Sequence, residues 1–379
     1  MRQFKVAIVG AGMIGRLHAR AFQAIESTFG DAGWRVELSV IADADEALTR
    51  DAQERWKIGR AVPSWRDVVE ADDVDIAVVG LPNQDHRAAV EALVAAGKHV
   101  LCEKPLAPTV EAARSMLDAA RRAGVVHGIG FNLRRAPAIA AIRQMLVDGA
   151  IGAPRHLSGH FFTDYAVSTA VPFTWRYQRS LAGSGALGDV GSHILDLARY
   201  LLGDIAAVTG ATLATFIHER PVPAAHVTGH NIGPTTGQTG KVDTDDSGAF
   251  TCRFASGAIG DIRFSRVAPG HRGPAFDLIG SEGAISFDMR RPGEFGICSA
   301  PPGRDAVGSG FRRLAADPRF PYGSDLVAPI GFDYVDTYVA QAYEFLSAVA
   351  QQRQYEPGFE DGFAIAEVCE TVQRLADSG

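Results

Sequence analysis

Three glycines close to the N-terminus have the spacing of a phosphate-binding turn. Gly10, Gly12 and Gly15 form the pattern G-x-G-x-x-G between a buried strand that ends at residue 9 and a helix over 16–22. In such a turn the first glycine permits the tight bend, the second lets the backbone approach a pyrophosphate, and the third allows close packing of the helix. The free amides at the start of the helix attract the anion. The pattern in this setting predicts a dinucleotide site rather than a purely structural turn.

An acidic residue ends the second apolar strand, at the position expected to bind the ribose hydroxyls of the adenosine. This residue is Asp43, after the strand 36–42,. It lies farther from the glycines than the usual roughly 20 residues, and an insertion around 28–33 accounts for the excess,. A carboxylate repels a ribose phosphate, and Ala44 rather than an arginine follows it, so the sequence favours NAD over NADP,. A solvated carboxylate at a strand end is the alternative interpretation.

A carboxylate and an imidazole lie one helical turn apart in the second half of the chain. A helix predicted from Gly188 carries one apolar stripe and one polar stripe, and the polar stripe holds Asp189, His193, Asp196 and Tyr200,. A carboxylate at position i can fix the tautomer of an imidazole at i+4 and raise its basicity, as a general base requires. An ion pair on a helix face is the alternative from these residues alone. We expect Asp196 to support the site from behind or to face solvent.

The elements that position these residues change character along the chain. Apolar runs at 5–9, 36–42, 76–81, 99–102 and 125–130 alternate with amphipathic segments, which predicts parallel strands with crossover helices,. After about residue 150, tight turns join alternating strands, for example 249–254 with 258–264, which predicts a mostly antiparallel sheet,. The predicted fold is therefore α/β. An N-terminal Rossmann dinucleotide-binding domain over 1–131 precedes an α+β domain over 132–379 with an open-faced sheet.

Two kinds of segment remain in the second domain. The Gly/Pro-rich stretches 221–243 and 291–329 are long for connections and could be lids, arms or mobile segments,. Helices over 336–351 and 363–375 close the chain, and we expect the second to pack on the first domain,.

The composition restricts the class of partner. A formal charge of −7 over 379 residues argues against nucleic acid, which needs clustered Lys and Arg,. The sequence has no apolar run of the length of a membrane span and no signal-peptide core, so we expect a cytoplasmic protein,. The four cysteines lie far apart without a C-x-x-C pair, which favours free thiols over a metal site or disulfides,. A small-molecule substrate is the expected partner.

Four ordered motifs give the chain a family resemblance. They are the glycine turn, Leu-Pro-Asn-Gln-Asp-His at 81–86, Glu-Lys-Pro at 103–105 and Gly-Asp-Val-Gly-Ser-His at 188–193. Together they span nearly the whole chain, which resembles the glucose-fructose oxidoreductase and inositol dehydrogenase family (Gfo/Idh/MocA). The resemblance implies an NAD-dependent oxidoreductase that acts on CH–OH groups. Within the family, the sequence is most similar to the inositol and levoglucosan dehydrogenases. The resemblance also implies a homo-oligomer, a dimer or tetramer built through the open face of the second sheet.

The same resemblance assigns roles to the reactive side chains. It implies a cis peptide before Pro105 that aims Lys104 at the nicotinamide and the substrate. A cation there can hydrogen-bond a hydroxyl and stabilise the alkoxide character that grows as hydride leaves the carbon. His193 is expected as the acid/base and Asp189 as its partner or as a substrate ligand. The alternative for Lys104 is a surface lysine.

The remaining expected contacts fall into two groups. The cofactor contacts are Gly10, Gly12, Met13, Ile14, Gly15, Asp43, Leu81, Pro82, Asn83, His86, Glu103, Lys104, Asn132, Trp175 and Arg176. The substrate contacts are Lys104, Asn132, Tyr165, Arg176, Asp189, His193 and Tyr334. Trp175 could stack on a sugar ring, and a core tryptophan is the alternative. We expect no metal, because hydride transfer requires none.

The expected reaction is the NAD-dependent oxidation of a secondary hydroxyl of a cyclic polyol or pyranose. Three alternatives share the fold: a ketosugar reductase that runs in reverse, an NAD-dependent glycosidase, and a sugar sensor without catalysis. A sensor has no need of a lysine–histidine pair, so Lys104 and His193 argue against it.

Overall fold

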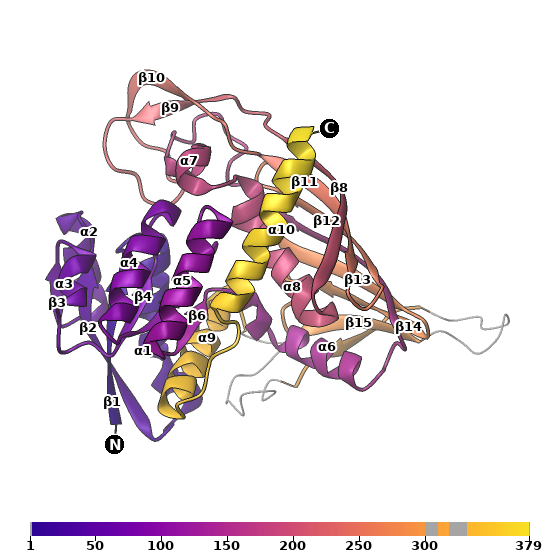
Figure 1. Ribbon diagram of the computed structural model, residues 1–379, viewed down its shortest axis with the longest axis horizontal. Coiled ribbons are helices and arrows are strands. Elements are labelled where there is room, and N and C mark those ends of the chain that lie inside the picture. Colours follow the sequence, from indigo (N-terminus) through magenta and orange to yellow (C-terminus); the bar gives the residue numbers. More distant parts are fainter. Residues whose placement is uncertain (1, 300–309, 318–331, 379) are drawn as a thin grey trace.

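The computed structural model describes residues 2–299, 310–317 and 332–378. Two sheets, each flanked by helices, lie side by side in it (Figure 1). In the described ranges, no helix combines the length and the apolar character needed to cross a membrane.

The first sheet has six parallel strands in the order β3-β2-β1-β4-β5-β6. They are β1 (Arg2–Val9), β2 (Trp34–Ala42), β3 (Arg60–Val62), β4 (Ile76–Val79), β5 (His99–Cys102) and β6 (His127–Ile129). In β1, Val6 and Ile8 pack into one buried cluster while Ala7 and Val9 pack into another, on the opposite face of the sheet. Strands buried on both faces read as continuous apolar runs, which is why the sequence revealed them. The strand order reverses between β1 and β4, where ligands bind in such sheets.

Helices cover both faces of this sheet. Buried side chains of α1 (Met13–Phe29), α2 (Glu46–Trp56) and α9 (Tyr334–Ala350) belong to one cluster. Those of α3 (Trp65–Val69), α4 (Asn83–Ala95), α5 (Val110–Ala123) and α10 (Phe359–Ser378) belong to the other. Both closing helices thus pack back onto the first sheet, whereas the sequence suggested this only for the last. Figure 1 shows α10 running across the molecule from the first sheet to the second.

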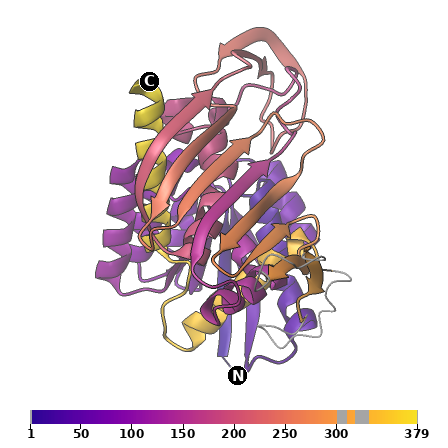
Figure 2. The same cartoon turned by 90° about the vertical axis from the view of Figure 1, so that its right-hand side faces the viewer.

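The second sheet has eight strands in the order β16-β15-β14-β13-β7-β12-β11-β8. They are β7 (Pro154–Phe162), β8 (Ile205–Ala214), β11 (Ser247–Phe254), β12 (Ile259–Ser265), β13 (Gly273–Gly280), β14 (Gly283–Asp288), β15 (Glu294–Ser299) and β16 (Arg312–Ala315). Their pairing is antiparallel except between β7 and β12, which confirms the predicted fold class. The helices α6 (Pro137–Val147) and α8 (Ser192–Leu202) pack on one face. The other face is open, as Figure 2 shows.

Short elements fill the remaining connections. The first, η1 (Asn132–Arg135), follows the first sheet, and η2 (Trp175–Tyr177), α7 (Arg179–Ala182) and η3 (Leu187–Gly191) lie between β7 and β8 of the second, with β9 (Glu219–Pro223) and β10 (Thr235–Lys241) forming a separate hairpin. The stretch 221–243 therefore holds the end of β9, all of β10 and the residues 224–234 that join them, and together these form an antiparallel arm. The stretch 291–329 contains β15 and β16, and much of the rest lies outside the described residues.

One element differs from its prediction in a way that affects the site. The helix predicted from Gly188 begins with a π-helical turn, η3, and becomes α-helical only at Ser192 in α8. A π turn has a wider hydrogen-bonding repeat than an α-helix, so residues four apart across it no longer lie on one stripe.

Candidate active site

The glycine turn joins β1 to α1, and two of its glycines are required by the protein's own packing. Gly10 has φ +102°, and a Cβ on it would lie 2.6 Å from the Gly80 carbonyl oxygen. A Cβ on Gly15 would lie 1.7 Å from the Gly10 carbonyl oxygen. A Cβ on Gly12, by contrast, would have no heavy atom within 4 Å. Packing therefore does not require a glycine at position 12, and the glycine leaves the backbone there open to the close approach of a ligand,.

Asp43 is tied to this turn. Its Oδ2 accepts a hydrogen bond from the Ala11 amide at 2.7 Å, and its Oδ1 accepts one from the Asp45 amide at 2.9 Å. An outer groove, lined by Gly10, Gly12, Met13, Asp43, Ala44, the start of α3 and residues 226–229, runs past it. The carboxylate is thus fixed at the groove wall, as binding of ribose hydroxyls requires.

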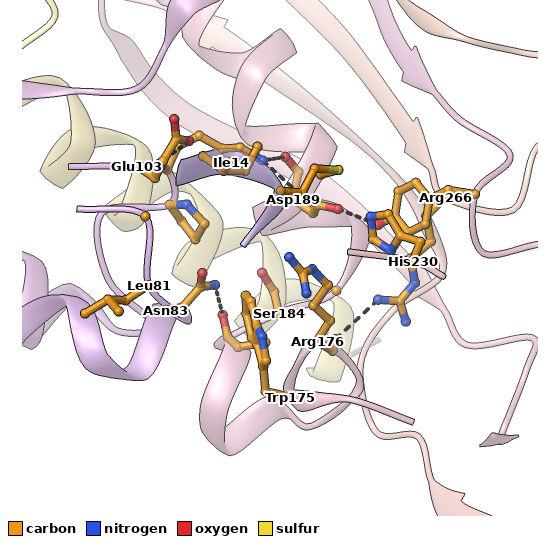
Figure 3. Close-up of a pocket in the computed structure, with 17 residues that line it drawn as sticks. Ile14, Leu81, Asn83, Glu103, Trp175, Arg176, Ser184, Asp189, His230 and Arg266 are labelled. Atoms are coloured by element: carbon orange, nitrogen blue, oxygen red, sulfur yellow. Dashed lines mark hydrogen bonds and ion pairs between the residues drawn. The ribbon is translucent and has the colours of Figure 1, made fainter. Parts of the chain in front are cut away.

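An inner pocket continues from this groove toward the second domain. Met13, Ile14, Leu81, Trp175 and Arg176 line both. The pocket is drawn in Figure 3, where side chains from both domains converge on one space. A dinucleotide is long enough to need such a continuous channel.

The turn after β5 brings Lys104 to this pocket. The peptide before Pro105 is cis, as the resemblance implied. Glu103, only 4% exposed, accepts a hydrogen bond from His18 Nε2 at 2.8 Å and a longer one from the Lys104 amide at 3.3 Å. Because both carboxylate oxygens have partners within the protein, Glu103 orients the turn as well as lining the pocket.

Lys104 and Asp189 form the central contact of the pocket. The Lys104 Nζ donates to Asp189 Oδ1 at 2.9 Å and to the Asp189 carbonyl oxygen at 2.7 Å. The Tyr165 hydroxyl donates to the other carboxylate oxygen, Oδ2. Three side chains from separate parts of the chain are therefore held in one hydrogen-bonded chain at the pocket wall.

The charges of this contact stabilise each other. Burial alone would lower the pKa of Lys104, but the charge and hydrogen bond of Asp189 outweigh it and raise the pKa above 10.5. Burial would likewise raise the pKa of Asp189, but Lys104 and Tyr165 hold it well below its usual value of 3.8. Burial and the Asp189 charge raise the pKa of Tyr165 well above 10. At neutral pH the pocket thus holds an ammonium, a carboxylate and a protonated phenol.

His193 lies behind the pocket wall rather than on it. Its side chain packs beside Phe131 and Phe161, with ring centroids 5.9 Å and 5.8 Å away, and it is 4% exposed. Burial, reinforced by the Lys104 charge, lowers the pKa of His193 well below 6.5, so the imidazole is neutral. Its Nδ1 is buried without a hydrogen-bond partner.

The predicted pairing of Asp189 with His193 is wrong. Asp189 directs its carboxylate to Lys104 and Tyr165 instead. The physical reason is the π turn η3 that contains Asp189, because it breaks the α-helical spacing on which the prediction rested,.

Asp196 was expected to support the site from behind or to face solvent, and its burial rules out the solvent-facing alternative. Asp196 is 1% exposed and accepts two hydrogen bonds from Arg134, at 2.9 Å from Nε and 2.6 Å from Nη2. It forms a buried structural ion pair.

The other predicted contacts divide by position. Those lining the pocket or the groove are Gly10, Gly12, Met13, Ile14, Asp43, Leu81, Pro82, Asn83, Glu103, Lys104, Tyr165, Trp175, Arg176 and Asp189. Those lining neither are Gly15, His86, Asn132, His193 and Tyr334. Both ring nitrogens of His86 face backbone carbonyls, among them those of Leu81 at 2.9 Å and Pro105 at 3.1 Å, so it ties two pocket turns together.

Asn132 and Tyr334 likewise bond within the protein. Asn132 is fully buried and donates to Thr337 Oγ1 at 2.6 Å. The Tyr334 hydroxyl lies 3.2 Å from that of Tyr338.

Among the titratable side chains that line the pocket, His230 and Arg266 were not predicted from the sequence. His230 stacks on Tyr165 with ring centroids 3.8 Å apart and lines the pocket, and burial, reinforced by the Arg176 charge, lowers its pKa to about 4. Arg266 also lines the pocket and donates to Asp246 at 2.9 Å. Neither stands in a recognisable motif, and the unusual length of the stretch 221–243 was the only signal for His230.

A segment of the second domain closes the remaining side. The Arg176 guanidinium lies 4.4 Å from the centre of the Trp175 ring, and both side chains line the pocket and the groove. Asn83 Nδ2 donates to the Ala182 carbonyl at 2.9 Å, which ties this segment to α4 (Figure 3). Trp175 is therefore a wall residue and not a core residue.

Comparison with known proteins agrees with this architecture. Residues 4–131 match the oxidoreductase family with an NAD-binding Rossmann fold, and residues 139–286 match the GFO/IDH/MocA C-terminal domain. Levoglucosan dehydrogenase of Pseudarthrobacter phenanthrenivorans is 34% identical over 99% of this chain and 97% of its own. Inositol 2-dehydrogenase of Rhizobium meliloti is 26% identical over 98% of this chain and 96% of its own. A solved levoglucosan dehydrogenase in complex with NADH and levoglucosan superposes with a TM-score of 0.91 at 34% identity, covering 100% of this chain and 98% of that one.

Proposed function

The chain belongs to the GFO/IDH/MocA family of NAD-binding oxidoreductases, and we propose that it oxidises a secondary hydroxyl of a cyclic polyol or pyranose sugar. The observation that carries the proposal is the buried contact of Lys104 with Asp189, 2.9 Å long, at the wall of a pocket continuous with the glycine turn. A permanent cation at this wall is what a reacting oxygen would need, and this supports the proposal.

The residues around the groove fit the cofactor. The open side of Gly12 and the amides at the start of α1 suit the pyrophosphate, and the fixed carboxylate of Asp43 suits ribose hydroxyls,. The inner pocket then takes the nicotinamide and the substrate together. When bound, NAD supplies the hydride acceptor, and the protein supplies binding and geometry.

Lys104 acts on the oxygen of the reacting hydroxyl. Its ammonium stabilises the negative charge that develops on this oxygen as the C–H bond breaks and the C=O bond forms. Asp189 and the Glu103 turn hold the ammonium in one orientation, so that no reorganisation is needed at the moment of reaction,.

We assign the hydroxyl proton to His193. The neutral imidazole can accept it, and the lowered pKa of His193 keeps the ring unprotonated at neutral pH,. Lys104 lines the pocket and its charge acts on His193, so the imidazole is near enough to the proposed reacting oxygen to support this assignment.

The walls of the pocket favour a ring-shaped polar substrate. Trp175 offers an aromatic face, while Tyr165, Arg176 and His230 offer hydrogen-bonding groups around it,. Levoglucosan is the first substrate to test, because the relative named for it matches almost the entire chain at 34% identity.

The test is a substrate panel. Levoglucosan, inositols and free aldoses are incubated with NAD+ or NADP+, and reduced nicotinamide is followed for the wild type and for Lys104→Ala. We expect NAD+ reduction with at least one cyclic substrate and a large loss in the variant. Turnover that Lys104→Ala leaves unimpaired, or the absence of turnover with every substrate, would overturn the proposal. Release of an aglycone from a glycoside without net NADH would indicate the glycosidase instead.

A further inference from the structure

An arm of the second domain reaches across to the glycine turn. The strands β9 and β10 pair with each other and with no other strand of the described residues, and residues 224–234, here called the strap, join them. Figure 1 shows this hairpin reaching out from the large sheet over the end of the first domain where the parallel strands point. The strap contributes residues 226–229 to the outer groove, opposite Gly12 and Asp43.

Two contacts join the strap to the first domain. His226 Nδ1 lies 3.4 Å from Asp45 Oδ2, and the His226 side chain is 59% exposed. The backbone of Gly229 lies against Met13, the first residue of α1: a Cβ on Gly229 would lie 3.8 Å from the Met13 Cβ and 3.5 Å from its Sδ. The groove is therefore covered where it passes the glycine turn.

The base of the hairpin is fixed firmly. Arg220 is fully buried and donates to the carbonyls of Ala166 and Ser168, at 2.8 Å and 2.9 Å. The Phe173 ring fills the space beside Gly240, where a Cβ would lie 2.4 Å from it. The tip of the strap, residues 226–229, is held in contrast by the exposed contact of His226 with Asp45 and by the contact of Gly229 with Met13, and exposed side-chain pairs contribute little. Movement would therefore be confined to the tip.

His230, which directly follows residues 226–229 in the strap, touches the reacting end of the site. His230 stacks on Tyr165 at 3.8 Å, and the Tyr165 hydroxyl donates to Asp189, which holds Lys104. The strap therefore reaches from the outer groove to the side chains that hold Lys104.

We propose that the strap is the outer wall of the dinucleotide site, and that NAD enters and leaves only when its tip lifts from Met13 and Asp45. This inference rests on the cofactor placement proposed above and on nothing about the sugar. In this arrangement a segment of the second domain covers the phosphates and the adenosine of the cofactor.

A reversible crosslink tests the proposal. The 3.8 Å between the two Cβ positions suits a disulfide, for which about 3.5–4.5 Å is usual,. The double variant Met13→Cys, Gly229→Cys is loaded with NADH, oxidised, and mixed with excess NAD+, while the loss of bound NADH fluorescence gives the release rate. We expect release at least about tenfold slower than in the reduced form of the same protein, with full recovery after a reductant.

The reduced double variant is the reference because position 229 has φ +64°, where cysteine is strained,. The two single-cysteine variants, treated with the same oxidant, control for oxidation of the native thiols and should release NADH at unchanged rates.

Two results would overturn the inference. One is equal release rates in the oxidised and reduced forms, with the disulfide verified by mass spectrometry. The other is failure of the disulfide to form, which would place the strap away from α1. The variant Asp43→Ala separates this inference from the cofactor placement. If Asp43→Ala binds NADH as tightly as wild type, the proposed placement of the cofactor is wrong. If Asp43→Ala binds NADH more weakly but the crosslinked protein still releases NADH at the normal rate, the cofactor placement stands and only the role of the strap is wrong.

Discussion

The substitution Asp189→Asn tests the contact on which the catalytic proposal depends. It keeps the size of the side chain but removes the negative charge that lies 2.9 Å from the Lys104 Nζ. A hydrogen bond to a charged group contributes about 1.5–3 kcal/mol, and each 1.4 kcal/mol corresponds to a factor of ten. We therefore expect kcat/KM to fall by about 10- to 150-fold. The Asp189 carbonyl still accepts from Lys104 at 2.7 Å, so the loss stays below that of Lys104→Ala.

The pH profile separates this effect from general damage. Burial lowers the pKa of Lys104 and the Asp189 charge raises it, so removal of that charge leaves burial opposed only by the smaller contributions of Glu103 and Tyr334. The basic limb of the kcat/KM profile, measured as NADH formation with the best substrate of the panel, therefore moves to lower pH in Asp189→Asn.

Asp196→Asn is the matched control, because Asp196 is a buried carboxylate on the adjoining helix that pairs with Arg134 instead. Breaking this pair should cost about 3–5 kcal/mol of unfolding free energy without moving the basic limb. The reasoning is refuted if Asp189→Asn retains activity within about twofold of wild type, or if its basic limb stays in place or moves upward.

Three further predictions follow from the same geometry. Gly15→Ala should destabilise the protein by several kcal/mol or prevent folding, because the added Cβ would lie 1.7 Å from the Gly10 carbonyl oxygen. Gly12→Ala should instead unfold at the wild-type temperature but bind NADH more weakly. Calorimetry together with an NADH titration decides this, and equal thermal stability of the two variants would contradict it. Asp43→Ala should raise the Kd for NAD+ more than that for NADP+, since it removes both a ribose ligand and a repulsive charge; equal loss for both cofactors would remove the ribose assignment. The acid limb of the kcat/KM profile for oxidation should lie below pH 6.5, because burial and the Lys104 charge lower the pKa of His193 and so keep the imidazole unprotonated down to that pH. If His193→Gln shows the same acid limb, His193 is not the base.

The sequence predicted the first sheet well because its signals are local. Strands buried on both faces are continuous apolar runs, and the roles of Gly10 and Gly15 follow from backbone sterics that any such turn shares,. The antiparallel second sheet was equally readable from its tight turns.

The site itself was only partly predictable. The spacing of Asp189 and His193 implied a regular helix, and nothing in the residue types announces the π turn that separates them. The contact of Asp189 with Lys104 joins residues 85 positions apart, so it depends on how the two domains pack and not on any local pattern.

The strap shows the same limit. A Gly/Pro-rich stretch indicates that a segment is irregular but not which surface it covers. His230 and residues 226–229 reach the site only because a hairpin anchored by Arg220 carries them there. The domain boundary at 131, the oligomeric state and the cytoplasmic location stay predictions.

Transfer of deuterium from the substrate to NADH tests the proposed hydride transfer directly. The best substrate of the panel, deuterated at its ring carbons, is oxidised with NAD+, and the NADH formed is analysed by mass spectrometry. The account predicts one deuterium in the NADH formed by the wild type, and almost no labelled NADH from Lys104→Ala. Product that forms without deuterium in NADH would contradict direct hydride transfer from the sugar carbon and, with it, the role given to Lys104.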